Sequence, residues 1–191
     1  FTGISADVDQ SLIDGVAYVY NHVTVTGLAE NSTYYYTVEK NSVETEPVEY
    51  KTGSFSSIKM LYVGDPQIGA SKGQPKEEEY AGYLNPQALQ SLPVATTIGN
   101  HDSLNLDYMY HFYNPNATEY GATQAGGDYY YSYGPGLFIV LNTNNYNVAE
   151  HEKAIAEAVA SDPDAAWRVV TIHQDIYGTG LDHSDTDGMI L

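Results

Sequence analysis

The chain of 191 residues contains no cysteine, few basic residues and no long apolar run. Without cysteine it can form neither a disulfide framework nor a metal site built on thiolates. Its 7 Lys and Arg residues stand against 25 Asp and Glu, which gives a formal net charge of −18. This charge argues against nucleic acid and anionic membranes as partners, because both favour basic surfaces. An acidic surface instead attracts cations, including divalent metals.

Two further absences narrow the class of protein. No apolar run approaches the length of a membrane-spanning helix, and no signal peptide opens the chain. The composition, with 42% hydrophobic and 17% charged residues, is nevertheless that of a globular protein. The 19 tyrosines and the scarcity of lysine favour a secreted or cell-surface protein whose export signal was removed before Phe1.

The pattern of the chain changes near residue 55. Residues 18–26, 33–39 and 48–55 alternate in polarity and are rich in Val, Thr and Tyr, which predicts β-strands. No helical periodicity lies between them, so they indicate part of an antiparallel β-sandwich. Such a sandwich takes about 100 residues. We therefore expect a first domain, residues 1–55, that is partial at its N-terminal side.

Strands and helices alternate after residue 55, as in an α/β layer. The pattern predicts strands at 58–63, 94–98, 129–133, 137–142 and 167–172, and helices at 77–90, 106–113 and 150–160. The Asn85-Pro86 sequence interrupts the first helix, and Asn147 is a candidate N-cap of the last one, with Glu150 three residues on. Residues 56–191 form the expected second domain.

Polar residues with metal-binding side chains follow three of these strands. Asp65 follows the first, Asn100 and His101 follow the second, and His173 follows the last. Carboxylate, amide and imidazole groups suit Zn²⁺, Mn²⁺ or Fe, and adjacent strand ends can bring them together. Two metals about 3.5–4 Å apart can clamp a phosphoryl group and generate a hydroxide nucleophile. A neighbouring imidazole can stabilise or protonate the leaving oxygen.

These motifs resemble those of the calcineurin-like metallophosphoesterase superfamily. The resemblance rests on Val-Gly-Asp-Pro-Gln at 63–67, Gly-Asn-His-Asp at 99–102 and Val-Val-Thr-Ile-His at 169–173. Residues 20–28, 32–36 and 51–55 are similar to the fibronectin-III-like N-terminal domain of purple acid phosphatases. The resemblance covers nearly the whole chain. It implies an α/β (α+β) layered β-sandwich with flanking helices, preceded by a partial fibronectin-III-like β-sandwich.

The resemblance also implies roles for individual residues. Asp65 would be a ligand of the first metal, and Asn100 and His173 would be ligands of the second. His101 would contact the phosphate and assist the leaving group, and Asp102 would orient His101. The implied cofactor is a binuclear centre of Fe, Zn or Mn, and the implied substrate is a small phosphorylated molecule, in most cases a phosphomonoester.

The chain departs from the family pattern at three places. Gln67 stands where the first motif, Asp-x-His, has its histidine. The Gly-Asp strand that supplies a bridging carboxylate, with the tyrosine ligand that follows it, is absent between Asp65 and Gly99, and so is the final Gly-His-x-His. Either segments are missing from the sequence or a deletion has disabled the site. The abrupt Gln74-Pro75-Lys76 junction favours missing sequence. We expect the chain as it stands to hold metal weakly and to turn over slowly.

Each candidate residue also has a simpler interpretation. Asp65 can be a turn or capping residue, residues 100–102 a polar turn, and His173 a hydrogen-bonded histidine at a strand end. Gln67 is a bystander or a vestigial contact, and His183 lines the substrate pocket or lies in a solvated loop. Three other histidines are interpreted as structural or surface residues: His22, His111 and His151. The alternative function is a noncatalytic, degenerate phosphoesterase fold that binds a partner at the cell surface. The sequence leaves the oligomeric state open.

Overall fold

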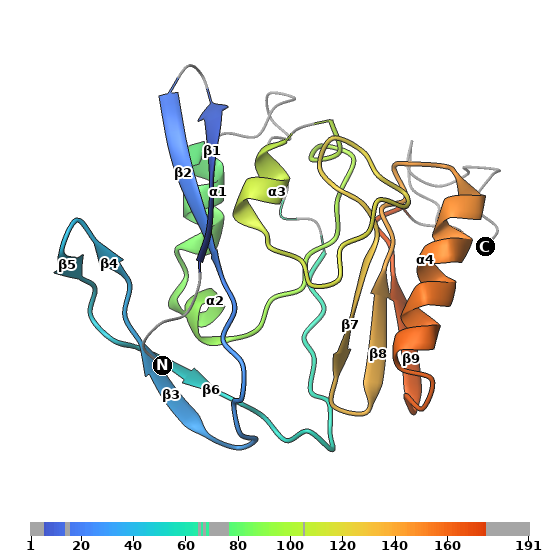
Figure 1. Cartoon of the computed structure of the whole chain (residues 1–191), viewed down its shortest axis with the longest axis horizontal. Coiled ribbons are helices and arrows are strands. Elements are labelled where there is room, and N and C mark those ends of the chain that lie inside the picture. The colour runs from blue at the N-terminus through green and yellow to red at the C-terminus, as the bar shows by residue number, and fades with distance from the viewer. Residues whose placement is uncertain are drawn as a thin grey trace.

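The computed structural model describes residues 6–13, 16–64, 66, 68, 77–104 and 106–174. An antiparallel β part comes first, and a part that contains both helices and strands follows it (Figure 1). This order agrees with the change of pattern expected near residue 55. The assignment of either part to a known fold remains a prediction.

The N-terminal part consists of short antiparallel strand pairs. These are β1 (Ala6–Ile13) with β2 (Val16–Val23), β3 (Thr33–Tyr36) with β6 (Val48–Lys51), and β4 (Glu39–Lys40) with β5 (Val43–Glu44). In the described residues they form three separate two-stranded sheets. Asn41 and Ser42 close the β4–β5 pair with φ angles of 53° and 61°. Two successive residues with positive φ are typical of the type I′ turn, whose twist matches that of the strands it joins.

Three short helices connect this part to the next. They are α1 (Glu77–Leu84), α2 (Gln87–Ser91) and α3 (Asp107–His111). Pro86 separates α1 from α2 and occupies the N-cap position of α2 with φ −55° and ψ 129°. The interruption expected at Asn85-Pro86 is therefore confirmed. It follows from the missing N–H of proline and its clash with the preceding turn.

A three-stranded sheet with one long helix contains the main core. Its strands are β7 (Tyr129–Tyr133), β8 (Gly136–Val140) and β9 (Trp167–Thr171), and its helix is α4 (Val148–Ser161). β7 runs antiparallel to β8, and β9 runs parallel to β8 because α4 crosses back between them (Figure 1). Leu137, Ile139 and Leu141 are buried with Ala158 of α4 and Tyr130 of β7. All four elements were expected within two residues of their bounds.

Asn147 occupies the N-cap position of α4, as the sequence predicted, but its side chain does not cap a backbone N–H. Its amide nitrogen instead donates to Glu150 Oε1 at 2.8 Å. The other carboxylate oxygen of Glu150 accepts from the backbone N–H of Gly121 at 2.9 Å. Glu150 therefore ties the first turn of α4 to the loop that precedes β7.

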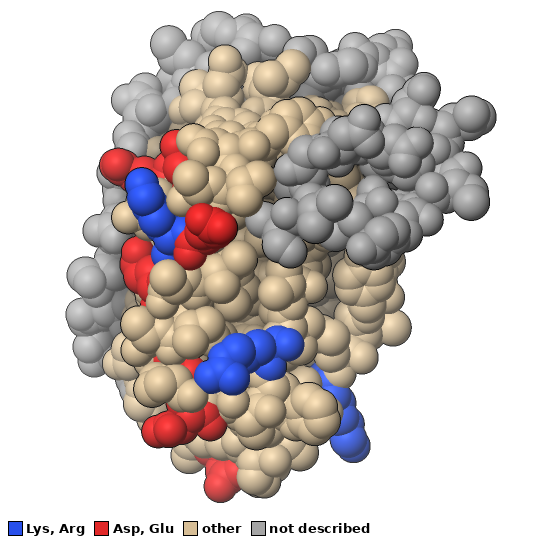
Figure 2. All heavy atoms as spheres, turned by 90° about the vertical axis from the view of Figure 1, so that its right-hand side faces the viewer, with Lys and Arg blue, Asp and Glu red and all other residues tan. Residues whose placement is uncertain are grey.

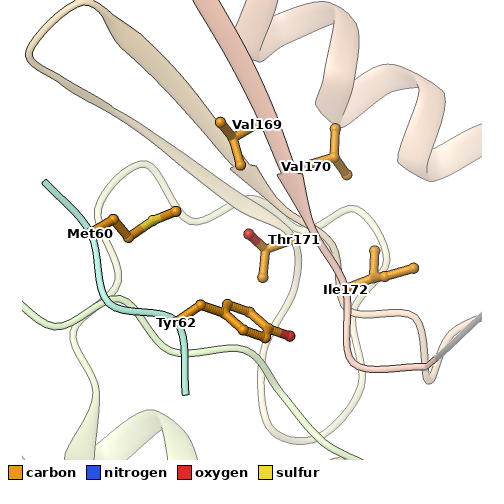
Figure 3. Close-up of a pocket in the computed structure, with 6 residues that line it drawn as sticks. All are labelled: Met60, Tyr62, Val169, Val170, Thr171 and Ile172. Carbon is orange, nitrogen blue, oxygen red and sulfur yellow. The ribbon is translucent and has the colours of Figure 1, made fainter. Parts of the chain in front are cut away.

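The strand expected at residues 58–63 is not formed. Leu61, Tyr62 and Val63 are 86%, 70% and 73% exposed, so this segment is not the buried strand that its apolar sequence predicted. Met60 and Tyr62 face the outer edge of β9 across a cavity of about 280 Å³, lined on the other side by Val169–Ile172 (Figure 3). Hydrogen-bonded strands lie about 4.8 Å apart. The segment lies across this cavity from β9 and forms no ladder with it.

The strand expected at residues 94–98 is also not formed. Its backbone is hydrogen-bonded by side chains and not by a neighbouring strand. The Thr96 carbonyl accepts from the Tyr129 hydroxyl at 2.6 Å, and the Ile98 carbonyl accepts from Asn144 Nδ2 at 3.0 Å. The Thr96 and Tyr108 hydroxyls are 2.6 Å apart. Ile98 and Tyr108 form a second small core with Ala125. The segment is extended and anchored, but it belongs to no ladder.

A carboxylate and an imidazole are buried together beneath α4. Asp128 Oδ2 lies 2.7 Å from His151 Nδ1, and both residues are 0% exposed. Asp128 Oδ1 accepts from the Asn142 N–H at 2.8 Å, and His151 Nε2 lies 2.7 Å from the Asn145 carbonyl. Burial raises the pKa of the Asp128 carboxyl above its ordinary value, while the hydrogen bonds from Asn142 and His151 oppose this rise. His151 is therefore structural, one of the two roles the sequence left open.

Gly121 is fitted tightly against this pair. Its φ is +61°, and a Cβ atom at this position would lie 2.5 Å from Asp128 Oδ1 and 2.6 Å from His151 Cε1. Both the backbone conformation and the space therefore require glycine. The loop before β7 can close on α4 only because residue 121 has no side chain.

The surface carries its charges in scattered positions. On the face that Figure 2 shows, acidic and basic side chains lie among uncharged ones, and no continuous basic patch is visible among the residues drawn in colour. Of the helices in the described ranges, none is both long and apolar enough to cross a membrane.

Substitution of Asp128 by alanine should destabilise the fold strongly. The change leaves the His151 imidazole and the Asn142 N–H buried without their acceptor. Breaking a buried pair from one side costs about 3–5 kcal/mol of unfolding free energy, and chemical denaturation would measure it. Glu152→Gln, an exposed change in the same helix turn as His151, is the control and should leave the midpoint unchanged. Equal midpoints for the two variants would contradict a stabilising role for the pair.

Stability should fall steeply at alkaline pH because of Tyr108. Burial raises the pKa of its phenol to about 12, so between pH 10 and 12 the folded state holds a proton that the unfolded state has released. Below pH ~10 this contribution to the free energy of unfolding is fully present. It is lost as the pH rises through 12, and the total loss is about 3 kcal/mol. Urea unfolding at pH 9, 10 and 11 should show a shallower decline for Tyr108→Phe than for Tyr146→Phe, which removes an exposed phenol. Parallel declines in the two variants would refute the assignment.

Candidate functional site

Two of the predicted metal ligands meet in the structure. Asn100 Oδ1 lies 3.0 Å from His173 Nε2, although 73 positions separate the two residues in the chain. Asn100 follows the extended segment 93–99, and His173 lies two residues beyond the end of β9. Both side chains are half-buried. The structure therefore brings these two chain segments together at one place.

Gly99 makes this approach possible. A Cβ atom on residue 99 would lie 3.2 Å from His173 Cε1 and 3.2 Å from Asp102 Oδ2. Such contacts are tighter than ordinary van der Waals distances, so a side chain here would push His173 away from the loop. The glycine of the Gly-Asn-His-Asp motif thus has a steric role next to the ligand pair.

Residues 99–103 form a compact turn that fixes Asn100. The Gly99 carbonyl accepts from the backbone N–H groups of Asp102 at 3.2 Å and Ser103 at 3.0 Å. Asp102 Oδ2 accepts from the Gly99 N–H at 3.2 Å, and the Ser103 hydroxyl donates to the Asn100 carbonyl at 3.0 Å. Ser103 is buried. The carboxylate of Asp102 therefore stabilises the turn, and its predicted role in orienting His101 remains a prediction.

His101 lies on the same turn, between Asn100 and Asp102. Its side chain is half-buried, and within the described part of the chain it makes no hydrogen bond or ion pair. Three other predicted residues, Asp65, Gln67 and His183, lie outside the described residues. The structure thus brings together four of the seven candidates: Asn100, His101, Asp102 and His173.

A buried tyrosine adds a neutral donor near this turn. Tyr80 of α1 is 0% exposed, and among the described residues its hydroxyl has no hydrogen-bond partner. Burial raises the pKa of this phenol first, and the negative charges of Asp102 and Asp107 raise it further. The phenol therefore stays protonated at neutral pH. A buried hydroxyl without a partner is uncommon in folded proteins.

A network of side-chain amides beneath the turn was not predicted from the sequence. Asn144 Nδ2 donates to the Ile98 carbonyl at 3.0 Å, and Asn144 Oδ1 accepts from Gln174 Nε2 at 2.7 Å. The Thr143 hydroxyl donates to Gln174 Oε1. Asn142, Thr143 and Gln174 are all buried. The available signal was the polar run at 142–145 directly after an apolar strand, a position where open sheets often carry functional residues.

The donor chemistry of the ligand pair fits a divalent cation. Two ligand atoms about 2.1 Å from one ion lie about 3.0 Å apart at the right angles of an octahedral site and about 3.4 Å apart at the tetrahedral angle of Zn²⁺. The observed distance between Asn100 Oδ1 and His173 Nε2 is compatible with the octahedral spacing. Within the described ranges, no group of three or more His, Cys, Asp or Glu side chains is arranged to hold a metal. Asn100 and His173 thus provide two ligands, and Asp65, a predicted third, lies outside the described residues.

Comparison with known proteins did not extend this assignment. No profile of a known protein family, no curated protein and no solved structure matches the chain.

Proposed function

We propose that the chain is a metal-dependent phosphoester hydrolase whose metal site includes Asn100 and His173. The observation that carries this proposal is the 3.0 Å contact between the two side chains, which come from segments far apart in the chain. The sequence alone also indicates both residues as ligands. An imidazole next to an amide oxygen is a donor set that Zn²⁺, Mn²⁺ and Fe accept.

The neighbouring side chains suit hydrolysis of a phosphate ester. A bound metal would polarise the phosphoryl group and lower the pKa of its bound water. His101 directly follows Asn100 on the same turn, and its side chain is half-buried. In its protonated form this imidazole would neutralise charge on a phosphate oxygen or donate a proton to the leaving group. We assign it the role of acid and phosphate contact.

The net charge supports the cation and shapes the choice of substrate. A formal charge of −18 attracts divalent ions toward the protein and repels phosphate esters. A metal at Asn100 and His173 would reverse the sign locally. A phosphorylated substrate is therefore expected to bind only after the metal. We propose a small phosphomonoester as substrate and secretion or surface display as the setting, in which the acidic surface faces an environment that supplies the cation.

One observation favours a second candidate, a noncatalytic binding protein. Residues 60–63 expose four successive apolar side chains, and large exposed apolar patches often mark interaction sites. On this hypothesis the Asn100–His173 contact is only a hydrogen bond at the end of two loops. A measurement of metal binding distinguishes the metal-dependent hydrolase from the noncatalytic binding protein.

The wild-type chain should bind Mn²⁺ or Zn²⁺, and Asn100→Ala and His173→Ala should each weaken binding at least tenfold, since each removes a ligand atom. Isothermal titration calorimetry measures the affinities. Asn85→Ala and His22→Ala, which alter residues outside the site, are matched controls and should bind like the wild type. Affinities equal to those of the controls in both site variants would exclude this metal site and favour the binding-protein alternative.

The metal-loaded chain should hydrolyse a generic aryl phosphate, and His101→Ala should lower the rate about 10²-fold because the leaving group loses its acid. Colour release from the aryl phosphate measures the rate, and calorimetry should show unchanged metal affinity in this variant. A wild-type rate no higher than that of His101→Ala would reject the hydrolase assignment even if the metal is bound.

A further inference from the structure

The side-chain amide of Asn144 contacts both loops that carry the ligand pair. Its nitrogen donates to the Ile98 carbonyl at 3.0 Å, and its oxygen accepts from Gln174 Nε2 at 2.7 Å. Ile98 lies two residues before Asn100, and Gln174 directly follows His173. Asn144 thus bridges the two loops within two residues of each candidate ligand.

Asn142 connects Asn144 by hydrogen bonds to the rest of the fold. Asn144 Nδ2 also donates to Asn142 Oδ1 at 2.9 Å. The amide nitrogen of Asn142 donates to the Thr123 hydroxyl at 3.0 Å and to the Gly126 carbonyl at 2.9 Å. The backbone N–H of Asn142 donates to Asp128, the partner of His151. Buried networks in which every group is satisfied hold a single arrangement of side chains.

In the described part of the chain, no backbone ladder joins the segment before Asn100 to the segment that carries His173. The segment 93–99 belongs to no sheet, so backbone pairing with β9 does not fix its position relative to His173. The other side-chain anchors of the segment, the Tyr129 and Tyr108 hydroxyls, bind Thr96, which is four residues from Asn100. Asn144 is a bridge that joins the chain segment next to Asn100 to the segment next to His173.

We propose that Asn144 is a positioning residue that keeps Asn100 Oδ1 in contact with His173 Nε2. The effect of Asn144 on metal binding rests on the proposed function. The effect of Asn144 on the Asn100–His173 contact in the metal-free protein is independent of that function. Because Asn100 Oδ1 accepts a hydrogen bond, the contact selects the His173 tautomer with the proton on Nε2.

The test compares Asn144→Leu with Asn145→Ala. Leucine has a similar volume but makes none of the three side-chain hydrogen bonds of Asn144. Asn145→Ala is the matched control, because Asn145 donates to the Ala122 carbonyl and accepts from the Asn147 N–H but contacts neither ligand loop. Its backbone carbonyl, which faces His151, is kept in the alanine variant.

Nitrogen-15 NMR of the histidine rings in the metal-free protein gives the first readout. In the wild type and in Asn145→Ala, His173 should be in the Nε2–H tautomer. In Asn144→Leu it should become a mixture of tautomers, while the His151 signals stay unchanged because the buried pair is intact. Loss of general stability alone would not produce this change at one histidine. An unchanged His173 tautomer in Asn144→Leu would overturn the proposal.

Calorimetry with Mn²⁺ or Zn²⁺ gives the second readout. Asn144→Leu should bind the metal at least tenfold more weakly than Asn145→Ala, in the range typical of groups that orient ligands. If the wild type binds no metal, the proposed function fails, and the tautomer readout still decides the role of Asn144. If Asn144→Leu does not fold, Gln174→Met replaces it, because this change cuts the bridge only on the His173 side and should give the same tautomer mixture. A single wild-type tautomer in Gln174→Met would then reject the role.

Discussion

The hydrogen-bonded pair of Asp128 and His151 is the contact on which the arrangement of the strand ends depends. Both ring nitrogens of His151 face oxygen atoms, Asp128 Oδ2 and the Asn145 carbonyl. Either the ring carries two protons and Asp128 is ionised, or Asp128 keeps the shared proton and the ring is neutral. Both arrangements satisfy every hydrogen bond and leave the pair without net charge, which is why it can be fully buried. Together with Asn142, the pair joins α4, the loop before β7 and the end of β8.

Side-chain amides continue this rigid contact toward the candidate site. From Asp128 the hydrogen bonds run through Asn142 and Asn144 to the Ile98 carbonyl on one side and to Gln174 on the other. They replace the backbone pairing that the segment 93–99 lacks. A strand in a sheet is held by many equivalent hydrogen bonds, whereas this segment is held by a few specific side chains. The geometry at Asn100 should therefore depend on single residues to a degree that a site on paired strands would not.

The sequence predicted the elements whose pattern is local. α4, β7, β8 and β9 lie within two residues of the expected bounds, because an apolar run or an amphipathic period is visible without its neighbours. Residues 58–63 and 94–98 have equally strand-like sequences, but a strand needs a partner at hydrogen-bonding distance, and no local pattern reports this. The same distinction holds in the site. Asn100 and His173 were found from their places at the ends of apolar runs, whereas Asp128 and Asn144 resemble the polar residues of any loop. Only the fold shows that Asp128 is buried and that Asn144 joins two loops.

The hydrogen bond between Asn100 and His173 prepares the site for a cation more than it blocks one. A cation that takes both atoms must replace this hydrogen bond, whose net contribution to stability is about 1 kcal/mol. The larger cost of bringing two loops 73 residues apart to one place has already been met by the fold. The 3.0 Å separation also lies close to that of two atoms on one ion, so little movement is required. Rigidity at the strand ends therefore favours binding, because the ligands lose little conformational entropy when the metal arrives.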